Sequence, residues 1–368
     1  MATTHLQLQG ERFYLDGRPT YEGVSFEGRP VEGLLFNARL VMGLFDDLNE
    51  DTRARWAYPD TGTWDAERNV REFLAQMPVW RSHGLLGLTL NLQCGNPVRG
   101  GSSTPGGVVP LEQPWHVTAY HRDGSLRPEW LDRLARILDE ADRLGMVVIL
   151  GLFYFGQDHR LEDQDAVRRA AENVIGWLDD TDRRNVIVEI ANECNIPRYT
   201  HDLLTPRGMV SFIKELRSAT STALPLAASY AGVPQFGIVP PQELIDVVDV
   251  ALIHGNEIHG TADFEAQIRA VRELTRHRPI PVVVNEDNHF DFDDRPNHLY
   301  TAVENYASWG YFDPGAGGDY HDGFQCPPVN WGLTTPRKQA FFRHVAQLTG
   351  TTGPTTAGAN VDAHGVRA

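Results

Sequence analysis

Eight short apolar runs alternate with stretches of helical periodicity, and this alternation restricts the fold more than any other feature of the sequence. We interpret the apolar runs as strands; they are 21–26, 85–92, 146–155, 186–191, 224–229, 247–254, 281–285 and 309–312. A strand followed by a helix, repeated along the chain, is typical of a parallel sheet whose faces are covered by helices. Eight such units predict an α/β fold, the (β/α)₈ TIM barrel.

The segments between the strands carry the helical pattern. In 128–144 the apolar positions recur at steps of three or four residues, at Leu131, Leu134, Ile137, Leu138 and Ala141. Pro128 suits the first turn of this helix and Gly145 its end. The other predicted helices are 66–82, 166–178, 206–220, 263–277, 296–308 and 336–348.

One domain accounts for the 368 residues better than two, because no linker rich in Pro, Gly and Ser divides the chain and no internal repeat is present. Residues 1–20 predict a short β-hairpin, since two alternating segments flank Gly10. We expect the catalytic barrel at 21–350 and a flexible C-terminal tail at 351–368. Two predicted long loops, 94–121 and 313–335, follow strands, so they would lie on the C-terminal face, where barrel active sites form.

The charge balance and the cysteines argue against several classes of protein. With 33 Lys and Arg against 49 Asp and Glu, the formal charge is −16, which disfavours a nucleic-acid or membrane partner. Residues 1–7 lack the pattern of a signal peptide, and the longest apolar stretch is too short to cross a bilayer. The three cysteines, Cys94, Cys194 and Cys326, are too few for a disulfide framework. These features predict a cytoplasmic protein.

Two Asn-Glu dipeptides, each at the end of a predicted strand, are the strongest candidates for a catalytic site. Asn192-Glu193 follows the fourth strand and Asn285-Glu286 ends the seventh. In a barrel, such side chains point into a shared mouth, so two glutamates far apart in sequence can face each other. A pair of carboxyl groups can cleave a glycosidic bond, one as nucleophile and the other as proton donor. Glu189 is expected instead inside the barrel, as a buried, paired carboxylate.

The two motifs, 190–193 and 284–286, resemble those of clan A of the glycoside hydrolases, the retaining (β/α)₈ enzymes that include cellulases, mannanases and β-galactosidases. The resemblance implies that Glu193 is the acid/base, that Asn192 contacts the sugar 2-hydroxyl and that Glu286 is the nucleophile. It also implies a carbohydrate substrate, either a β-D-pyranoside or an α-L-arabinofuranoside. No cofactor is expected.

Further positions extend the resemblance. Trp331 is similar to the clan's aromatic platform near strand eight, and His254 to a strand-six position that often carries His or Tyr. Flat aromatic faces pack on pyranose rings, although core packing is the alternative for each aromatic side chain. The chain departs from many members at 88–91, where they have an arginine, and at 255–256, where they have a tyrosine. The expected substrate-binding residues are Asn91, Trp115, Tyr154, Asn192, His254, Asn285 and Trp331.

The function predicted from these residues is a retaining glycoside hydrolase that acts by double displacement, with carboxyl groups about 5–5.5 Å apart. Because no export signal is present, we expect it to cut a small oligosaccharide or glycoside from one end. Whether the chain forms a homo-oligomer stays open.

Two alternatives stay open. The first is a metal-dependent barrel hydrolase or isomerase that uses His254, His289 and nearby carboxylates; His259, Asp287 and His321 also follow strands. The absence of Cys-x-x-Cys and His-x-His patterns argues against a metal site, and none is predicted. The second is a non-catalytic barrel that binds sugar on its aromatic side chains.

Overall fold

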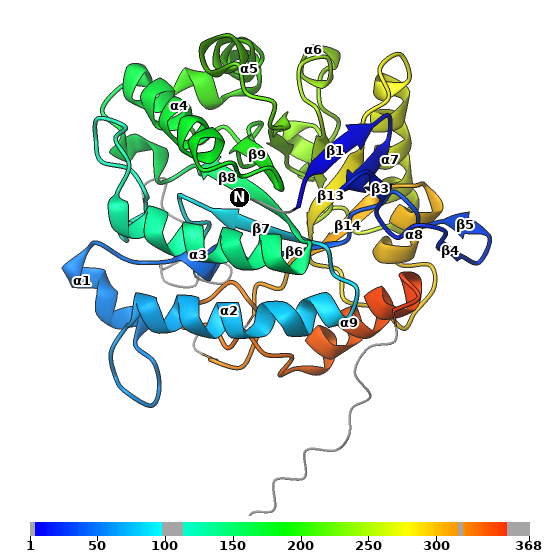
Figure 1. Ribbon diagram of the computed structural model, residues 1–368, viewed down its shortest axis with the longest axis horizontal. Coiled ribbons are helices and arrows are strands. Elements are labelled where there is room, and N and C mark those ends of the chain that lie inside the picture. Colours follow the sequence, from blue (N-terminus) through cyan, green and yellow to red (C-terminus); the bar gives the residue numbers. More distant parts are fainter. Residues whose placement is uncertain (1–3, 98–112, 316–318, 352–368) are drawn as a thin grey trace, which may run out of the picture.

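A closed ring of parallel strands surrounded by helices forms the protein (Figure 1). The computed structural model describes residues 4–97, 113–315 and 319–351. The ring strands, in chain order, are β6 (Asn37–Arg39), β7 (Gly87–Asn91), β8 (Val147–Phe153), β9 (Val186–Ala191), β10 (Leu226–Ala227), β11 (Ser229–Tyr230), β12 (Ala251–His254), β13 (Val282–Asp287) and β14 (Ser308–Tyr311).

The ring has eight members because β10 and β11 are two parts of one strand, separated by Ala228. The first part pairs with β9 and the second with β12, and β14 pairs with β6 to close the ring. Chain order is therefore also ring order. The predicted (β/α)₈ barrel is confirmed.

The first barrel strand is β6, so the prediction of a strand at 21–26 is wrong. Part of that segment forms β4 (Ser25–Phe26), which pairs antiparallel with β5 (Arg29–Pro30). The strand β6 is short and contains Asn37 and Arg39, both buried. Its polar side chains interrupt the apolar pattern from which the other strands were predicted, and this concealed Arg39.

Most predicted helices are present. The helices α2 (Ala66–Ser82), α3 (Pro128–Leu144), α5 (Pro206–Thr220) and α9 (Pro336–Leu348) have the predicted bounds. Local signals explain this accuracy: Thr205 and Thr335 cap α5 and α9, a proline follows each cap, and Gly145 takes a left-handed conformation after α3. The remaining helices are α1 (Glu50–Arg53), α4 (Gln164–Asp180), α6 (Gln242–Ile245), α7 (Thr261–Thr275) and α8 (His298–Glu304), with 3₁₀ turns at Val41–Leu44, Ala54–Trp56, Asp158–Arg160, Asp202–Leu204 and Pro234–Phe236.

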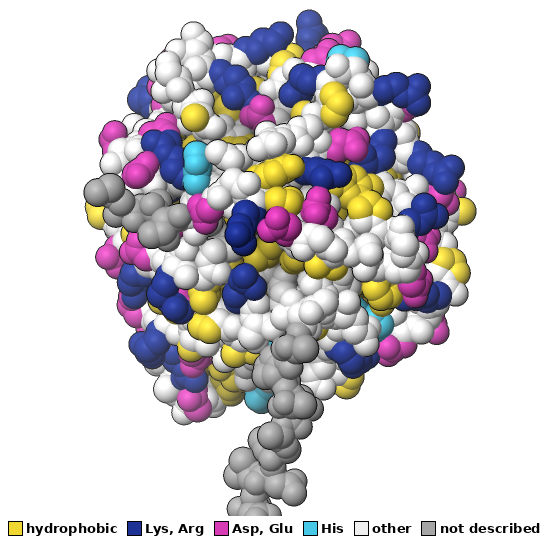
Figure 2. Space-filling view, turned by 45° about the vertical axis from the view of Figure 1, so that its right-hand side comes forward, with side chains coloured by type: hydrophobic (Ala, Val, Ile, Leu, Met, Phe, Trp, Pro, Cys, Tyr) yellow, Lys and Arg dark blue, Asp and Glu magenta, His cyan; other side chains and the backbone are white. Residues whose placement is uncertain are grey.

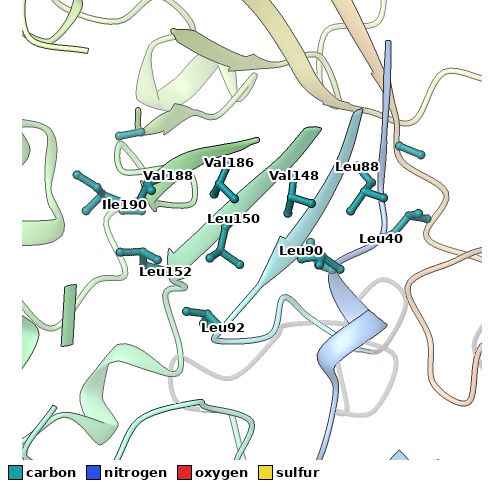
Figure 3. Packing of buried hydrophobic residues seen from close by; sticks show 14 of the residues in the cluster. Leu40, Leu88, Leu90, Leu92, Val148, Leu150, Leu152, Val186, Val188 and Ile190 are labelled. Carbon is teal, nitrogen blue, oxygen red and sulfur yellow. The ribbon is translucent and has the colours of Figure 1, made fainter. Parts of the chain in front are cut away.

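Alternate residues of the strands pack against the helices. Figure 3 shows one such layer, in which every second side chain of β7, β8 and β9 joins the same apolar cluster, as Leu88, Leu90, Val148, Leu150, Val186 and Val188 do. The residues between them face the barrel interior. Apolar side chains fill one end of that interior, namely Val147, Ile149, Ile187, Leu252 and Val283.

An N-terminal meander covers this apolar end. It consists of β1 (Leu6–Gln9), β2 (Arg12–Leu15) and β3 (Arg18–Pro19), and it lies in front of the barrel strands in Figure 1. Leu6 and Phe13 pack on the apolar interior, and the Leu6 N–H donates to Arg184 O, just before β9 begins. The N-terminal end of the barrel is therefore closed, which leaves the C-terminal end for a site.

The surface carries both signs of charge, interspersed on the face shown in Figure 2. Of the helices that can be described, none has the length and apolar character needed to cross a membrane. Parts of the two predicted loops, 98–112 and 316–318, lie outside the described residues, as does all of the predicted tail except Thr351.

Candidate active site

The two glutamates singled out by the sequence come together at the C-terminal end of the barrel. Glu193 follows β9, Glu286 lies on β13, and His254 ends β12. One carboxylate oxygen of each glutamate and a ring nitrogen of His254 all lie within 4.8 Å of one another. The glutamate side chains keep 13% and 10% of their surface exposed. Oxygens this close agree better with the carboxyl spacing of retaining glycosidases, about 5–5.5 Å, than with that of inverting ones, about 6.5–9.5 Å.

An irregularity in β13 turns Glu286 into the mouth. Val283 faces the apolar interior and Val284 faces the helices, so a regular strand would point residue 286 outward, away from the mouth. The pairing register with β14 shifts between Val284 and Asp287. Such a bulge lets two consecutive side chains, Asn285 and Glu286, leave the alternation.

His254 lies between the two glutamates with its side chain fully buried. Its Nδ1 is 2.9 Å from Glu193 Oε1 and 3.4 Å from Glu286 Oε2. Burial lowers the pKa of His254, but Glu286 and Glu193 outweigh burial and raise it above its ordinary value. The two glutamates therefore favour the protonated form of the His254 imidazole.

Arg39, at the end of β6, fixes Glu286. Its Nε lies 2.5 Å from Glu286 Oε2, and its Nη2 donates to Asn192 Oδ1 at 2.6 Å. Asn256 Nδ2 donates to the other oxygen, Glu286 Oε1, at 2.7 Å. The Arg39 Nη1 is 4.0 Å from Glu189, which is buried inside the barrel as expected, and burial raises the pKa of that carboxyl group. Glu286 is thus held in one orientation by an ion pair on one oxygen and a hydrogen bond on the other.

Neither Arg39 nor Asn256 was predicted to contact Glu286. Arg39 was missed because its strand was placed at 21–26, although the buried run 34–36 directly before it was a usable signal. Asn256 was noted only as a departure from the clan at the end of strand six. Many clan members have an arginine and a tyrosine at positions where this chain has neither. Here Arg39 and Asn256 contact Glu286 instead.

Tyr154, in the loop after β8, belongs to the site. Its ring stacks on Phe155, with centroids 4.2 Å apart. Burial is the main cause that raises the pKa of Tyr154, followed by Glu193 and then Glu286. The phenol is therefore protonated beside both carboxylates and can donate a hydrogen bond.

Asn91 and Asn285 lie in the strand walls rather than on the open surface of the mouth. Both are buried, and their amide groups have no hydrogen-bond partner among the residues that the structure describes. A side chain at Gly151 would collide with the Asn91 amide, so this glycine gives Asn91 its room. Their predicted role in binding substrate stays a prediction.

The structure does not bring Trp331 into the mouth, which corrects its expected role as a platform. Its side chain is 1% exposed and Nε1 donates to Asn69 of α2 at 3.0 Å. Phe73 packs on its edge at 4.8 Å and Phe324 stacks on it at 6.0 Å, between ring centroids. Trp115 is likewise buried, 5.9 Å from Trp56. Both tryptophans are thus buried in the protein and are not exposed to a sugar.

Trp331→Ala is therefore expected to lower the free energy of unfolding by about 3–5 kcal/mol, because it leaves a large cavity. The KM of any reaction at the candidate site should stay at the wild-type value. Urea unfolding followed by fluorescence, with kinetics on the same samples, measures both quantities. A raised KM with unchanged stability would return Trp331 to the sugar site.

A second cluster of possible metal ligands lies beside β13 and is a hydrogen-bonded anchor. His289 Nδ1 and His298 Nδ1 lie 2.5 and 2.7 Å from the two Asp287 oxygens, and Trp309 Nε1 donates to one of them at 2.9 Å. Burial raises the pKa of Asp287, but the hydrogen bonds from His289 and His298 bring it below its ordinary value. These contacts tie β13 to α8 and β14.

The other expected ligands do not gather. Among the described residues, the groups with metal-ligand spacing are Asp287, His289 and His298 in one case and Glu193, His254 and Glu286 in the other. The three cysteines are buried and form no disulfide bond with one another. His259 and His321, which also follow predicted strands, belong to neither group, and neither do the cysteines.

Comparison with known proteins identifies the fold. No family model matches the sequence, and no curated protein matches it. Solved structures do match. A GH5-4 broad specificity endoglucanase from Clostridium longisporum has a TM-score of 0.53 and 10% identity, over 86% of this chain and 97% of that one. A family 5 glycoside hydrolase from Bacteroides vulgatus has a TM-score of 0.54 and 12% identity, over 94% and 71%.

A third match is XEG5A, a GH5 xyloglucan-specific endo-β-1,4-glucanase from a metagenomic library, with a TM-score of 0.51 and 14% identity, over 84% of this chain and 96% of that one. At identities this low, the matches concern the fold. The structural neighbours of this chain are thus glycoside hydrolases of family 5, a clan A family, and the chain shares their (β/α)₈ barrel.

Proposed function

We propose that this protein is a retaining glycoside hydrolase with Glu286 as nucleophile and Glu193 as acid/base. The observation that carries the proposal is the pair of partly exposed carboxylates with oxygens within 4.8 Å of each other at the barrel mouth. The folds of the structural neighbours support it.

In the first step a Glu286 oxygen attacks the anomeric carbon and forms a glycosyl ester, while the bond to the leaving oxygen breaks. Glu193 gives its proton to that oxygen. In the second step Glu193 takes a proton from water, the water oxygen bonds to the anomeric carbon, and Glu286 leaves as a carboxylate. Arg39 and Asn256 aim Glu286 along this path.

The substrate class follows the clan: a β-D-pyranoside or an α-L-arabinofuranoside. A groove of about 620 Å³ is lined by, among others, Phe155, Arg198, Phe236 and His259. Phe155, at the edge of this groove, stacks on Tyr154. The groove supports an oligosaccharide substrate. Cutting from one end, a cytoplasmic location and a homo-oligomer stay predictions from the sequence. Two of the structural neighbours are described as endo-acting glucanases.

A panel of aryl glycosides tests the proposal. The 2,4-dinitrophenyl and phenyl glycosides of the common β-D-pyranoses and of α-L-arabinofuranose are incubated with the full chain, and release of the phenol is followed. We expect turnover of at least one sugar, with Glu286→Gln inactive. Binding of these sugars without any turnover would favour a non-catalytic barrel instead.

A metal-dependent hydrolase is the second candidate, because Glu193, His254 and Glu286 also have the spacing of a metal-binding group. The short contact between Arg39 and Glu286 argues against it, since the cation already occupies one of the oxygens. We expect activity to survive dialysis against EDTA unchanged. Loss on chelation with recovery on added Zn²⁺ or Mn²⁺ would favour the metal.

A further inference from the structure

The backbone of the proposed acid/base is held by a side chain that the catalytic steps do not use. Ser229 is the first residue of β11 and is completely buried. Its Oγ accepts the Glu193 N–H at 2.8 Å, and its carbonyl oxygen accepts the Cys194 N–H at 3.0 Å. Two consecutive residues of the loop after β9 are thus tied to one residue of the fifth strand.

Glu193 needs such a support because its backbone is unfavourable. Its φ of 49° lies in the left-handed region, where a residue with a side chain is strained by about 1–3 kcal/mol unless its surroundings hold it. The left-handed residue ends the strand and begins a turn, which the Ile196 N–H closes on Glu193 O at 2.9 Å. This conformation is the one in which the carboxylate meets His254 at 2.9 Å.

The position of the strand break agrees with this role. Strand five is interrupted at Ala228, between β10, which pairs with β9, and β11, which pairs with β12. Ser229 directly follows the interruption. It therefore lies on the strand that connects the elements of Glu193 and His254.

We propose that Ser229 is a positioning residue that holds the left-handed backbone of Glu193 and so aims its carboxyl group at the leaving oxygen. The proposal rests on the proposed function. It concerns proton donation, since Ser229 makes no hydrogen bond or ion pair with Glu286 or Arg39 among the described residues. The Ser229 hydroxyl group also faces the buried Glu189, so the test needs a readout that separates the two reaction steps.

The leaving group separates this role from a merely structural one. A dinitrophenolate leaves without protonation, whereas a phenolate needs the acid. Ser229→Ala should lower kcat/KM for the phenyl glycoside by about tenfold, the value of one hydrogen bond, and leave kcat/KM for the dinitrophenyl glycoside within about twofold. Ser229→Thr, which keeps the hydroxyl group, should restore the phenyl reaction.

Ser308→Ala is the matched control. Ser308 is a buried serine on β14 whose Oγ accepts the Leu35 N–H at 2.8 Å, and Leu35 packs in the apolar, covered end of the barrel. The control loses the same kind of bond away from the site, so both glycosides should react at wild-type rates. The phenyl and dinitrophenyl glycosides used with these variants carry the sugar that the aryl glycoside panel identifies as a substrate.

Two outcomes are decisive. The positioning role is overturned if Ser229→Ala lowers kcat/KM equally for both glycosides, or if it does not lower kcat/KM for the phenyl glycoside. This interpretation requires that Glu193→Ala still distinguishes the phenyl from the dinitrophenyl glycoside. If Glu193→Ala itself shows no such discrimination, or no glycoside is turned over by the wild type, the proposed function fails instead. Addition of Ser229→Ala to Glu193→Ala should change neither rate further, because the group it positions is gone.

Discussion

Glu286→Gly is expected to lower kcat by about 10⁴-fold or more, because no other described carboxylate can take the place of the nucleophile. Glu193 is the nearest candidate, but it is bound to His254 on the other side of the site. Glu189 lies deeper, beyond Arg39. Stability should fall as well, because removal of Glu286 leaves the buried Arg39 without its ion-pair partner, so the variant is compared with the wild type only after its folding has been checked by circular dichroism.

Azide sharpens this prediction. In the space left by the Glu286 carboxylate, azide can attack the anomeric carbon of a dinitrophenyl glycoside from the same side. The product expected is the glycosyl azide of inverted configuration, identified by its proton NMR spectrum. Glu304→Gln, at the exposed end of α8, is the control and should behave like the wild type. Substantial residual hydrolysis by Glu286→Gly without azide would contradict its role as nucleophile.

Glu193→Ala is expected to have the second largest effect, and one that depends on the leaving group. For the phenyl glycoside kcat/KM should fall by about 10²–10⁴-fold, because the acid is lost. For the dinitrophenyl glycoside kcat/KM should remain close to the wild-type value. The kcat for the dinitrophenyl glycoside should still fall, because hydrolysis of the glycosyl-enzyme is slow when no base activates the water.

Azide again distinguishes the two glutamates. It needs no general base, so it should restore kcat of Glu193→Ala on the dinitrophenyl glycoside and give the azide of retained configuration. Retention with Glu193→Ala and inversion with Glu286→Gly together define the two roles. An inverted azide from Glu193→Ala would exchange them.

The sequence carried enough information for the barrel strands other than β6 and for most of the helices. Helix bounds such as those of α5 and α9 are set by a capping threonine and the proline behind it, which are local signals. The buried strands β8 and β13 are continuous apolar runs, which only a sheet covered on both faces requires. The strand β6 is not a continuous apolar run, because it carries Arg39, which contacts Glu286.

The candidate site was predictable only in part. Glu193, His254 and Glu286 end predicted strands, so the barrel geometry alone places them together. Trp331 could not be placed, because whether an aromatic side chain faces a sugar or Phe73 depends on contacts between segments far apart in sequence. The bulge at Glu286 and the left-handed backbone of Glu193 likewise arise from tertiary contacts.

Trapping of the glycosyl-enzyme tests the central claim most directly. A dinitrophenyl 2-deoxy-2-fluoro glycoside of the selected sugar slows both steps, but its good leaving group lets the first step proceed, so the covalent intermediate accumulates. The account predicts inactivation with one sugar per chain, located by mass spectrometry on the peptide that contains Glu286. An active enzyme whose label lies on any other residue, or that is not labelled at all, would contradict it.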